Sequence, residues 1–189
     1  MSLARHAMKM PSPLEEITSE LTGEFGCRLI ARKRVLQWMR TYDIDCMGAL
    51  HSLITDHYDR IQPALQFDEY HPFVLTYLER CFLEDPQSEW AETRYGAGHT
   101  FNGWFVGWWR DPARRTSTVP ELKEWLAALY VSGDADVRKA LVAATLEHLF
   151  ENPEVAEYFS DWREHAVLST AYDEAMEWVE HGGRSPFWS

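Results

Sequence analysis

A glycine-rich segment, residues 95–100, is the first stretch of the chain whose residue types could do chemistry. Gly96 and Gly98 could expose backbone N–H groups to an anion, with Tyr95 and His99 beside them. The spacing does not match the phosphate-binding loop of nucleotide-binding proteins, and no strand pattern precedes it. The simpler interpretation is a polar loop, residues 86–100, in which the glycines allow a turn.

Tryptophans and arginines crowd the segment that follows. Phe101, Trp104, Trp108 and Trp109 recur at helical spacing in the apolar run 101–109, which predicts a short helix. Aromatic rings beside arginines are typical of energetic hot spots at protein interfaces, and such rings can also stack on sugars or bases. The alternative is core packing, with the arginines at its rim. The arginines near this run are Arg94, Arg110, Arg114 and Arg115.

Histidine–carboxylate pairs are the candidates for metal binding or acid–base chemistry. Asp161 with His165, and Glu177 with His181, would each share one helix face. A metal site needs more ligands than two, and neither H-E-x-x-H nor facing Glu-x-x-His motifs are present. A nucleophile motif such as G-x-S-x-G is also missing. We therefore expect no metal, no cofactor and no catalytic residue.

Isolated polar and thiol side chains fit structural roles. His51 falls on the apolar face of its predicted helix, where a histidine is usually part of the core. Cys27, Cys46 and Cys81 are odd in number, far apart and among apolar neighbours. Such cysteines are typical of reduced, buried thiols, which favours a cytoplasmic protein.

A basic run, Arg32-Lys33-Arg34, could contact phosphate or an acidic partner. Three consecutive residues project over most of a helix's circumference, so they do not form a focused patch. We expect a solvated face that pairs with acidic residues of the same chain.

The elements that must position these residues are helices. Ser12-Pro13-Leu14-Glu15 and Thr118-Val119-Pro120-Glu121 are capping-box patterns with an early proline. Asp45 and Asn152 are the expected caps of two further helices. Residues 27–40 are predicted as a helix, another helix starts at Pro72, and residues 110–118 are predicted as a loop.

The domain prediction follows from this pattern. We expect an all-α, single-domain bundle of seven or eight helices over residues 13–181. A flexible N-terminal tail (1–12) precedes it. A C-terminal tail (182–189) follows, in which Phe187 and Trp188 either dock back or stay free.

The composition excludes some partners. The 189 residues include 18 basic and 30 acidic ones, for a net charge of −12, and 14% are aromatic. Residues 1–40 carry +3 and the rest −15, so an acidic body favours cationic partners over nucleic acid. No long apolar run predicts a secretory signal or a membrane span.

Residues 126–172 resemble a known group of proteins. Leu129-Tyr130 ends a helix, Ser132-Gly133-Asp134 forms a turn, and a buried helix ends at Leu146-Glu147-His148-Leu149 before Asn152-Pro153. This order is similar to small, acidic, helical bacterial proteins of uncharacterised families, some of them suspected immunity proteins of toxin systems. The resemblance implies a protein partner and gives no catalytic residues.

The function that these observations predict is a non-enzymatic, protein-binding helical domain, of immunity type if the resemblance holds. The alternative is an enzyme or small-ligand domain with a pocket near His99 and the Trp-rich helix, and a homodimer that covers this helix is a third. No membrane or nucleic-acid partner is expected. The candidate binding residues are Arg94, Tyr95, His99, Trp104, Trp108, Trp109 and Arg110.

Overall fold

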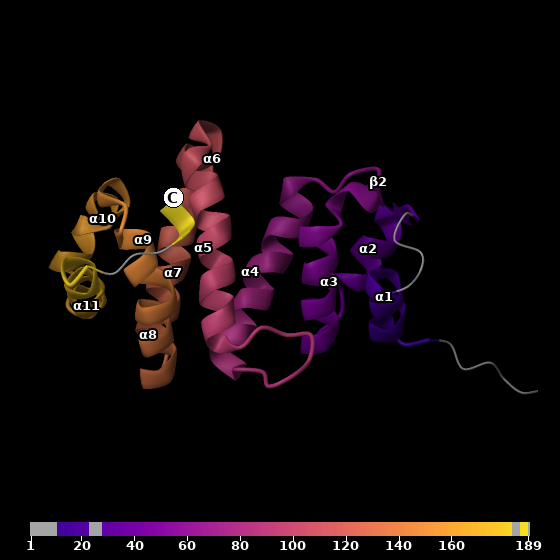
Figure 1. The fold of residues 1–189 in the computed structure, drawn as a ribbon, viewed down its shortest axis with the longest axis horizontal. Helices are drawn as coiled ribbons and strands as arrows, with labels where there is room; N and C mark the ends of the chain where they lie inside the picture. The colour runs from indigo at the N-terminus through magenta and orange to yellow at the C-terminus, as the bar shows by residue number, and fades with distance from the viewer. Residues whose placement is uncertain (1–10, 23–27, 183–185, 189) are drawn as a thin grey trace, which may run out of the picture. The chain divides into compact units, whose positions relative to one another are not determined.

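The fold is all-α, as the sequence predicted, in a computed structural model that describes residues 11–22, 28–182 and 186–188. Helices account for 77% of it, and eight α-helices have seven or more residues (Figure 1). Contacts divide the chain into two compact units, and each is considered by itself. The N-terminal unit contains residues 1–77 and 88–91, and the C-terminal unit contains residues 78–87 and 92–189. The single domain predicted for residues 13–181 stays a prediction.

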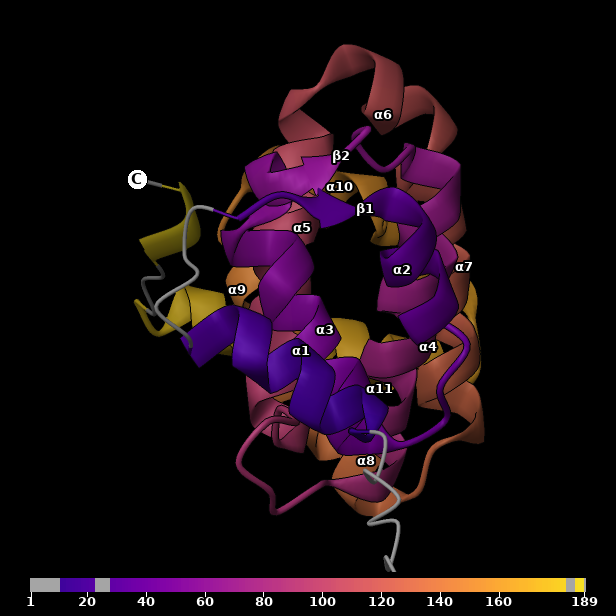
Figure 2. The same cartoon turned by 90° about the vertical axis from the view of Figure 1, so that its right-hand side faces the viewer.

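The N-terminal unit is built on helix α3, with α1 running across it (Figure 2). Ile17 of α1, Val35 of α2 and Leu50 of α3 are fully buried and form part of its core. A buried arginine, Arg60, ties its segments together. The guanidinium donates to the Glu20 and Arg28 carbonyls and to the Glu20 carboxylate. The elements are α1 (Pro13–Thr22), β1 (Ile30–Ala31), α2 (Arg32–Trp38), α3 (Ile44–Asp56), η1 (Tyr58–Arg60), β2 (Ile61–Gln62) and the first part of α4 (Phe67–Glu84).

The C-terminal unit has a core of aromatic rings. Phe105, Phe150 and Phe159 are fully buried and contact one another through Phe159. Residues 135–150 form one continuous helix that contains a π-helical turn, η2. The elements are the end of α4, α5 (Arg94–Arg110), α6 (Pro112–Ser117), α7 (Val119–Ser132), α8 (Ala135–Leu141), η2 (Val142–Leu146), α9 (Glu147–Phe150), α10 (Pro153–Tyr158), η3 (Ser160–Glu164), α11 (Leu168–Glu180) and η4 (Pro186–Trp188).

The predicted helix caps are partly confirmed. Ser12 Oγ accepts from the Glu15 N–H while the Glu15 carboxylate accepts from the Ser12 N–H, which is the predicted capping box. Asn152 caps α10 as expected. Thr118 makes no side-chain capping bond to α7, so that half of the second box is wrong. The cap of α3 is Asp43, which accepts from the Cys46 N–H, because Asp45 already lies inside the first turn.

Two predicted loops contain helices. The loop predicted for residues 86–100 is wrong at its end, because Thr93 Oγ1 accepts from the Gly96 N–H and starts α5 at Arg94. The loop predicted for residues 110–118 contains α6, which Asp111 caps and Pro112 starts. Each segment contains an N-cap residue that starts a helix, although the overall composition of the segment is typical of a loop.

Two predicted helix starts are also wrong. Residues 30–31 of the predicted helix 27–40 form a short strand, in which Ile30 pairs in parallel with Ile61. Both isoleucines are buried, so this pairing brings two apolar side chains into the core. Helix α4 begins at Phe67, ahead of the predicted start at Pro72, so Pro72 lies inside the helix. A proline at that position removes one intrahelical N–H donor, and the helix continues through it.

The structural roles predicted for His51 and two cysteines are confirmed. His51 is buried and stacks on Tyr77 at 5.1 Å between ring centres. Cys46 and Cys81 are buried free thiols, and burial raises the pKa of Cys46 to about 11. Cys27 and most of the 1–12 tail lie outside the described residues. The C-terminal tail docks through Phe187 and Trp188.

Candidate functional site

Helix α5 is held in the C-terminal unit by contacts that explain its glycines. A Cβ at Gly98 would lie 2.6 Å from the Ala144 Cβ, so only glycine allows η2 to approach this closely. One turn later, the buried Asn102 amide donates to the Ala144 carbonyl at 2.8 Å. Gly98 therefore serves helix packing and does not expose a loop to an anion. Gly103 and Gly107 face open space.

The predicted tryptophans are mostly packed. Trp108 and Trp109 are only 8% and 5% exposed, and Trp104 is half-buried with its ring 5.2 Å from that of Trp108. Trp109 stacks on Phe105 and meets the edge of Tyr158. Core packing therefore accounts for most of the surface of Trp108 and Trp109.

Arg94 has a structural role at the start of α5. Its Nε donates to the Phe82 carbonyl at 2.6 Å, and its backbone N–H donates to the Asp85 carboxylate at 2.8 Å. The bond to Phe82, with a longer one to the Leu83 carbonyl, satisfies carbonyl groups at the end of α4, which a helix otherwise leaves without partners. The neighbouring Tyr95 is 44% exposed.

His99 and Arg110 lie three turns apart on α5, and both contact the C-terminal turn η4, drawn in yellow in Figure 1. The exposed His99 ring stacks on Phe187, and Arg110 donates to the Phe187 carbonyl at 3.4 Å. The Trp188 indole N–H donates to the His148 carbonyl at 2.7 Å. The turn therefore joins the two ends of this face of α5 to α9.

His148 is a candidate residue that the sequence analysis did not select. Its ring is 5.2 Å from the His99 ring, and its Nδ1 is 3.8 Å from a Glu151 carboxylate oxygen. That distance gives electrostatic attraction without a hydrogen bond. Burial lowers the pKa of His148, the charge of His99 lowers it further, and Glu151 opposes both effects. A neutral imidazole beside a carboxylate could accept a proton.

A hollow of about 510 Å³ lies next to this cluster, and we call it the Trp109–Trp188 hollow. Arg115 stacks over Trp109 at 3.8 Å and pairs with Glu154 at 3.3 Å. Arg110 lies 5.9 Å above Trp188. The residues that line the Trp109–Trp188 hollow are Trp109, Arg110, Arg115, Glu151, Asn152, Pro153, Glu154 and Trp188.

The hollow unites only part of the predicted site. Trp109 and Arg110 line it, whereas Arg94, Tyr95, His99, Trp104 and Trp108 do not. The sequence alone did not identify the other lining residues. Residues 151–154 and Trp188 are distant in sequence from α5 and α6, and they come close to these helices only in the folded chain.

The histidine–carboxylate pairs weighed for metal binding have other contacts. Asp161 pairs with Lys123, while His165 Nδ1 accepts from the Val167 and Leu168 N–H groups at the start of α11. His181 contacts the Glu177 backbone carbonyl. Among the described residues, no group of three or more His, Cys, Asp or Glu side chains could hold a metal ion.

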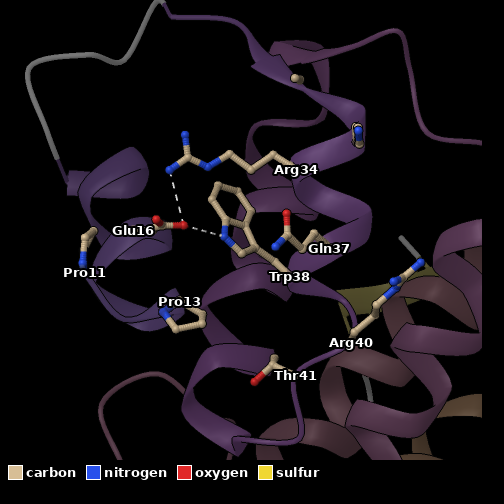
Figure 3. A pocket seen from close by; sticks show the side chains of 10 residues that line it. Pro11, Pro13, Glu16, Arg34, Gln37, Trp38, Arg40 and Thr41 are labelled. Atoms are coloured by element: carbon tan, nitrogen blue, oxygen red, sulfur yellow. Dashed lines mark hydrogen bonds and ion pairs between the residues drawn. The ribbon is translucent and has the colours of Figure 1, made fainter. Parts of the chain in front are cut away.

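A larger hollow, of about 680 Å³, lies in the N-terminal unit between α1 and α2 (Figure 3), and we call it the α1–α2 hollow. Glu16 reaches from α1 between Arg34 and Trp38 of α2. The basic run pairs with acidic residues of the same chain, as predicted, through Arg32 with Glu69 and Arg34 with Glu16. Lys33 and Arg34 both line this hollow. The lining residues are Pro11, Pro13, Glu16, Ala31, Lys33, Arg34, Gln37, Trp38, Arg40 and Thr41.

Comparisons with family models, curated proteins and solved structures gave no match to this chain. In the described parts of the chain, every helix is too short or too polar to cross a membrane.

Proposed function

We propose that this chain is a non-enzymatic, cytoplasmic helical protein that binds another protein at the Trp109–Trp188 hollow. The observation that carries the proposal is the pair of tryptophans, each with an arginine over its ring. Tryptophan and arginine are the residues most enriched at energetic hot spots. An arginine already stacked on a ring loses little conformational freedom when a partner arrives.

The charge around the hollow favours a partner with a basic face. The C-terminal unit has ten basic and nineteen acidic residues, a formal net charge of −9. Glu151 and Glu154 lie within the lining. Such a surface attracts cationic proteins over long range and orients them before contact. The resemblance of residues 126–172 to suspected immunity proteins also favours another protein as the partner.

The experiment has two stages. A photo-crosslinking amino acid at Pro153, in the hollow, captures the partner in cells of the source organism, and the same group at exposed Lys139 is the control. The captured protein is then purified and titrated against Arg115→Ala and Trp188→Ala. We expect each variant to weaken binding by about 10- to 30-fold, as at a hot spot. Lys139→Ala should change the affinity less than about twofold.

The outcome that excludes this surface is clear. If Arg115→Ala and Trp188→Ala bind the purified partner as tightly as the original chain, then contact occurs elsewhere. Arg115 is exposed and Trp188 half-buried, so circular dichroism should show both variants folded.

A second candidate function is a small-ligand or catalytic site at His99 and His148. It is favoured by the half-buried His148 ring, which lies between the His99 ring and the Glu151 carboxylate, whose charge favours the protonated imidazole. Imidazole NMR signals of His148 should then shift on addition of a ligand from a fragment library, and His148→Gln should abolish binding. The homodimer, the third possibility, requires a dimer mass by light scattering.

A further inference from the structure

The α1–α2 hollow concentrates positive charge in an acidic protein. Lys33, Arg34 and Arg40 line it, and Glu16 is its single acidic residue. Lys33 and Arg40 pair with no carboxylate among the residues that the structure describes, whereas Arg32 is held by Glu69. Three cations against one anion leave a hollow that attracts negative charge.

Glu16 occupies the position that an incoming carboxylate would take. One of its oxygens, Oε2, accepts from the Trp38 indole N–H at 3.0 Å and lies 3.3 Å from the Arg34 guanidinium (Figure 3). Arg34 also stacks over the Trp38 ring at 5.1 Å and is 46% exposed. A guanidinium has five N–H donors, so Arg34 keeps donors for a second carboxylate.

We propose that the α1–α2 hollow binds an acidic segment of another polypeptide, and that Glu16 competes with this segment for Arg34. The proposal uses a different unit from the Trp109–Trp188 hollow, so each stands or fails by itself. The bound segment's carboxylates would meet Lys33, Arg34 and Arg40.

The shape of the hollow favours a polypeptide over a small anion. Lys33 and Arg34 begin α2, whereas Arg40 follows its end, so the cations do not converge on one point. Pro11, Pro13 and Trp38 add apolar side chains to the lining, and a mixed lining of this kind suits an extended chain with spaced carboxylates. Nucleic acid is disfavoured, because the N-terminal unit carries eight basic and eleven acidic residues in total.

The test measures binding of a fluorescent peptide of alternating Glu and Ser, about ten residues long, to the full chain by anisotropy. We expect Lys33→Glu and Arg40→Glu each to weaken binding by about tenfold, the value of one charge-assisted contact. Glu16→Gln should strengthen it by about threefold or more. The amide oxygen still accepts from the Trp38 indole, but the competing charge is gone. Binding should weaken as salt rises to about 0.15 M.

Matched controls separate this site from general electrostatics. Lys139→Glu makes the same charge change at an exposed position of α8 in the C-terminal unit and should alter peptide binding less than about twofold. Circular dichroism melting of Glu16→Gln checks that any change reflects binding rather than folding.

Several results would overturn the proposal. One is an equal loss of binding in Lys139→Glu and Lys33→Glu, and another is unchanged or weaker binding in Glu16→Gln. Displacement of the peptide by inorganic phosphate at equal charge concentration would indicate a simple anion site instead. Tighter binding of a single-stranded oligonucleotide would indicate nucleic-acid recognition.

Discussion

The two hollows contain the same three residue types in two different arrangements. In the α1–α2 hollow, Glu16 is bound to both Arg34 and the buried Trp38 indole N–H. In the Trp109–Trp188 hollow, Glu154 touches only Arg115, and it is 70% exposed. The first carboxylate is therefore part of the structure, while solvent screens the second. Glu16 is thus held by two contacts on its tryptophan–arginine pair, whereas Glu154 is held by one contact to Arg115.

The same contrast extends to the units around the hollows. The N-terminal unit relies on a buried charge, Arg60 of η1, which bonds to α1 and to the segment that precedes β1. The C-terminal unit relies on rings such as Phe105, Phe150 and Phe159, which need no charged partner. Changes in charge and pH should therefore affect the two units differently.

Removing the buried arginine should have the largest effect. Arg60→Met leaves the Glu20 carboxylate and two carbonyls without their donor, in a site where the arginine is 5% exposed. We expect the free energy of unfolding to fall by about 3–5 kcal/mol, because an uncompensated charge stays buried. Urea denaturation followed by circular dichroism measures this, with Arg40→Met as the neutral control. A loss below about 1 kcal/mol would show that the N-terminal unit does not depend on this charge.

The pH dependence should have opposite signs in the two units. Burial lowers the pKa of His51 to about 4, from 6.5 when unfolded. The neutral form is therefore favoured by folding, and stability falls as pH drops from about 6.5 to 4, by at most about 3 kcal/mol. Burial and the charge of Glu174 raise the pKa of Glu147 to about 6, from 4.5. That contribution is lost as pH rises through 6, and solvent screening limits it to about 1 kcal/mol or less.

Stability measured from pH 4.5 to 7.5 separates the two groups. The stability of His51→Phe, relative to that of the original chain, should increase as the solution becomes more acidic. The stability of Glu147→Gln, relative to that of the original chain, should increase as the solution becomes more alkaline. Parallel curves for either variant would contradict the assigned pKa direction.

The smallest effect compares the two glutamates directly. Glu16→Ala leaves the indole N–H of Trp38, a 3%-exposed residue, without an acceptor, which should cost about 1–2 kcal/mol. Glu154→Ala removes a solvent-exposed ion pair and should change stability by less than about 0.5 kcal/mol. Both are measured by urea midpoints in one buffer, and equal losses would remove the distinction between the hollows.

Local patterns in the sequence predicted much of the fold but little of the site. The capping box at Ser12 and Glu15 depends on residues three apart, so it could be recognised directly. Gly98 was misread because its reason is Ala144, which is distant in sequence. The basic run pairs with acidic residues of the same chain as predicted. The hollow beside it was not predicted, because Glu16 and Arg40 complete it from outside α2. Trp109 and Arg110 were predicted, but Glu154 and Trp188 join them only in the folded chain.

The π-helical turn η2 has a consequence for the register of the helix that contains it. A π-turn holds one residue more than an α-turn, so every residue after it is rotated by about 100° relative to a regular helix. The Asn102 amide bonds to the Ala144 carbonyl within this turn. Deleting one residue between 142 and 146 would restore regular winding and turn His148 and Glu151 away from His99. The inserted residue thus sets which side chains of α9 face α5.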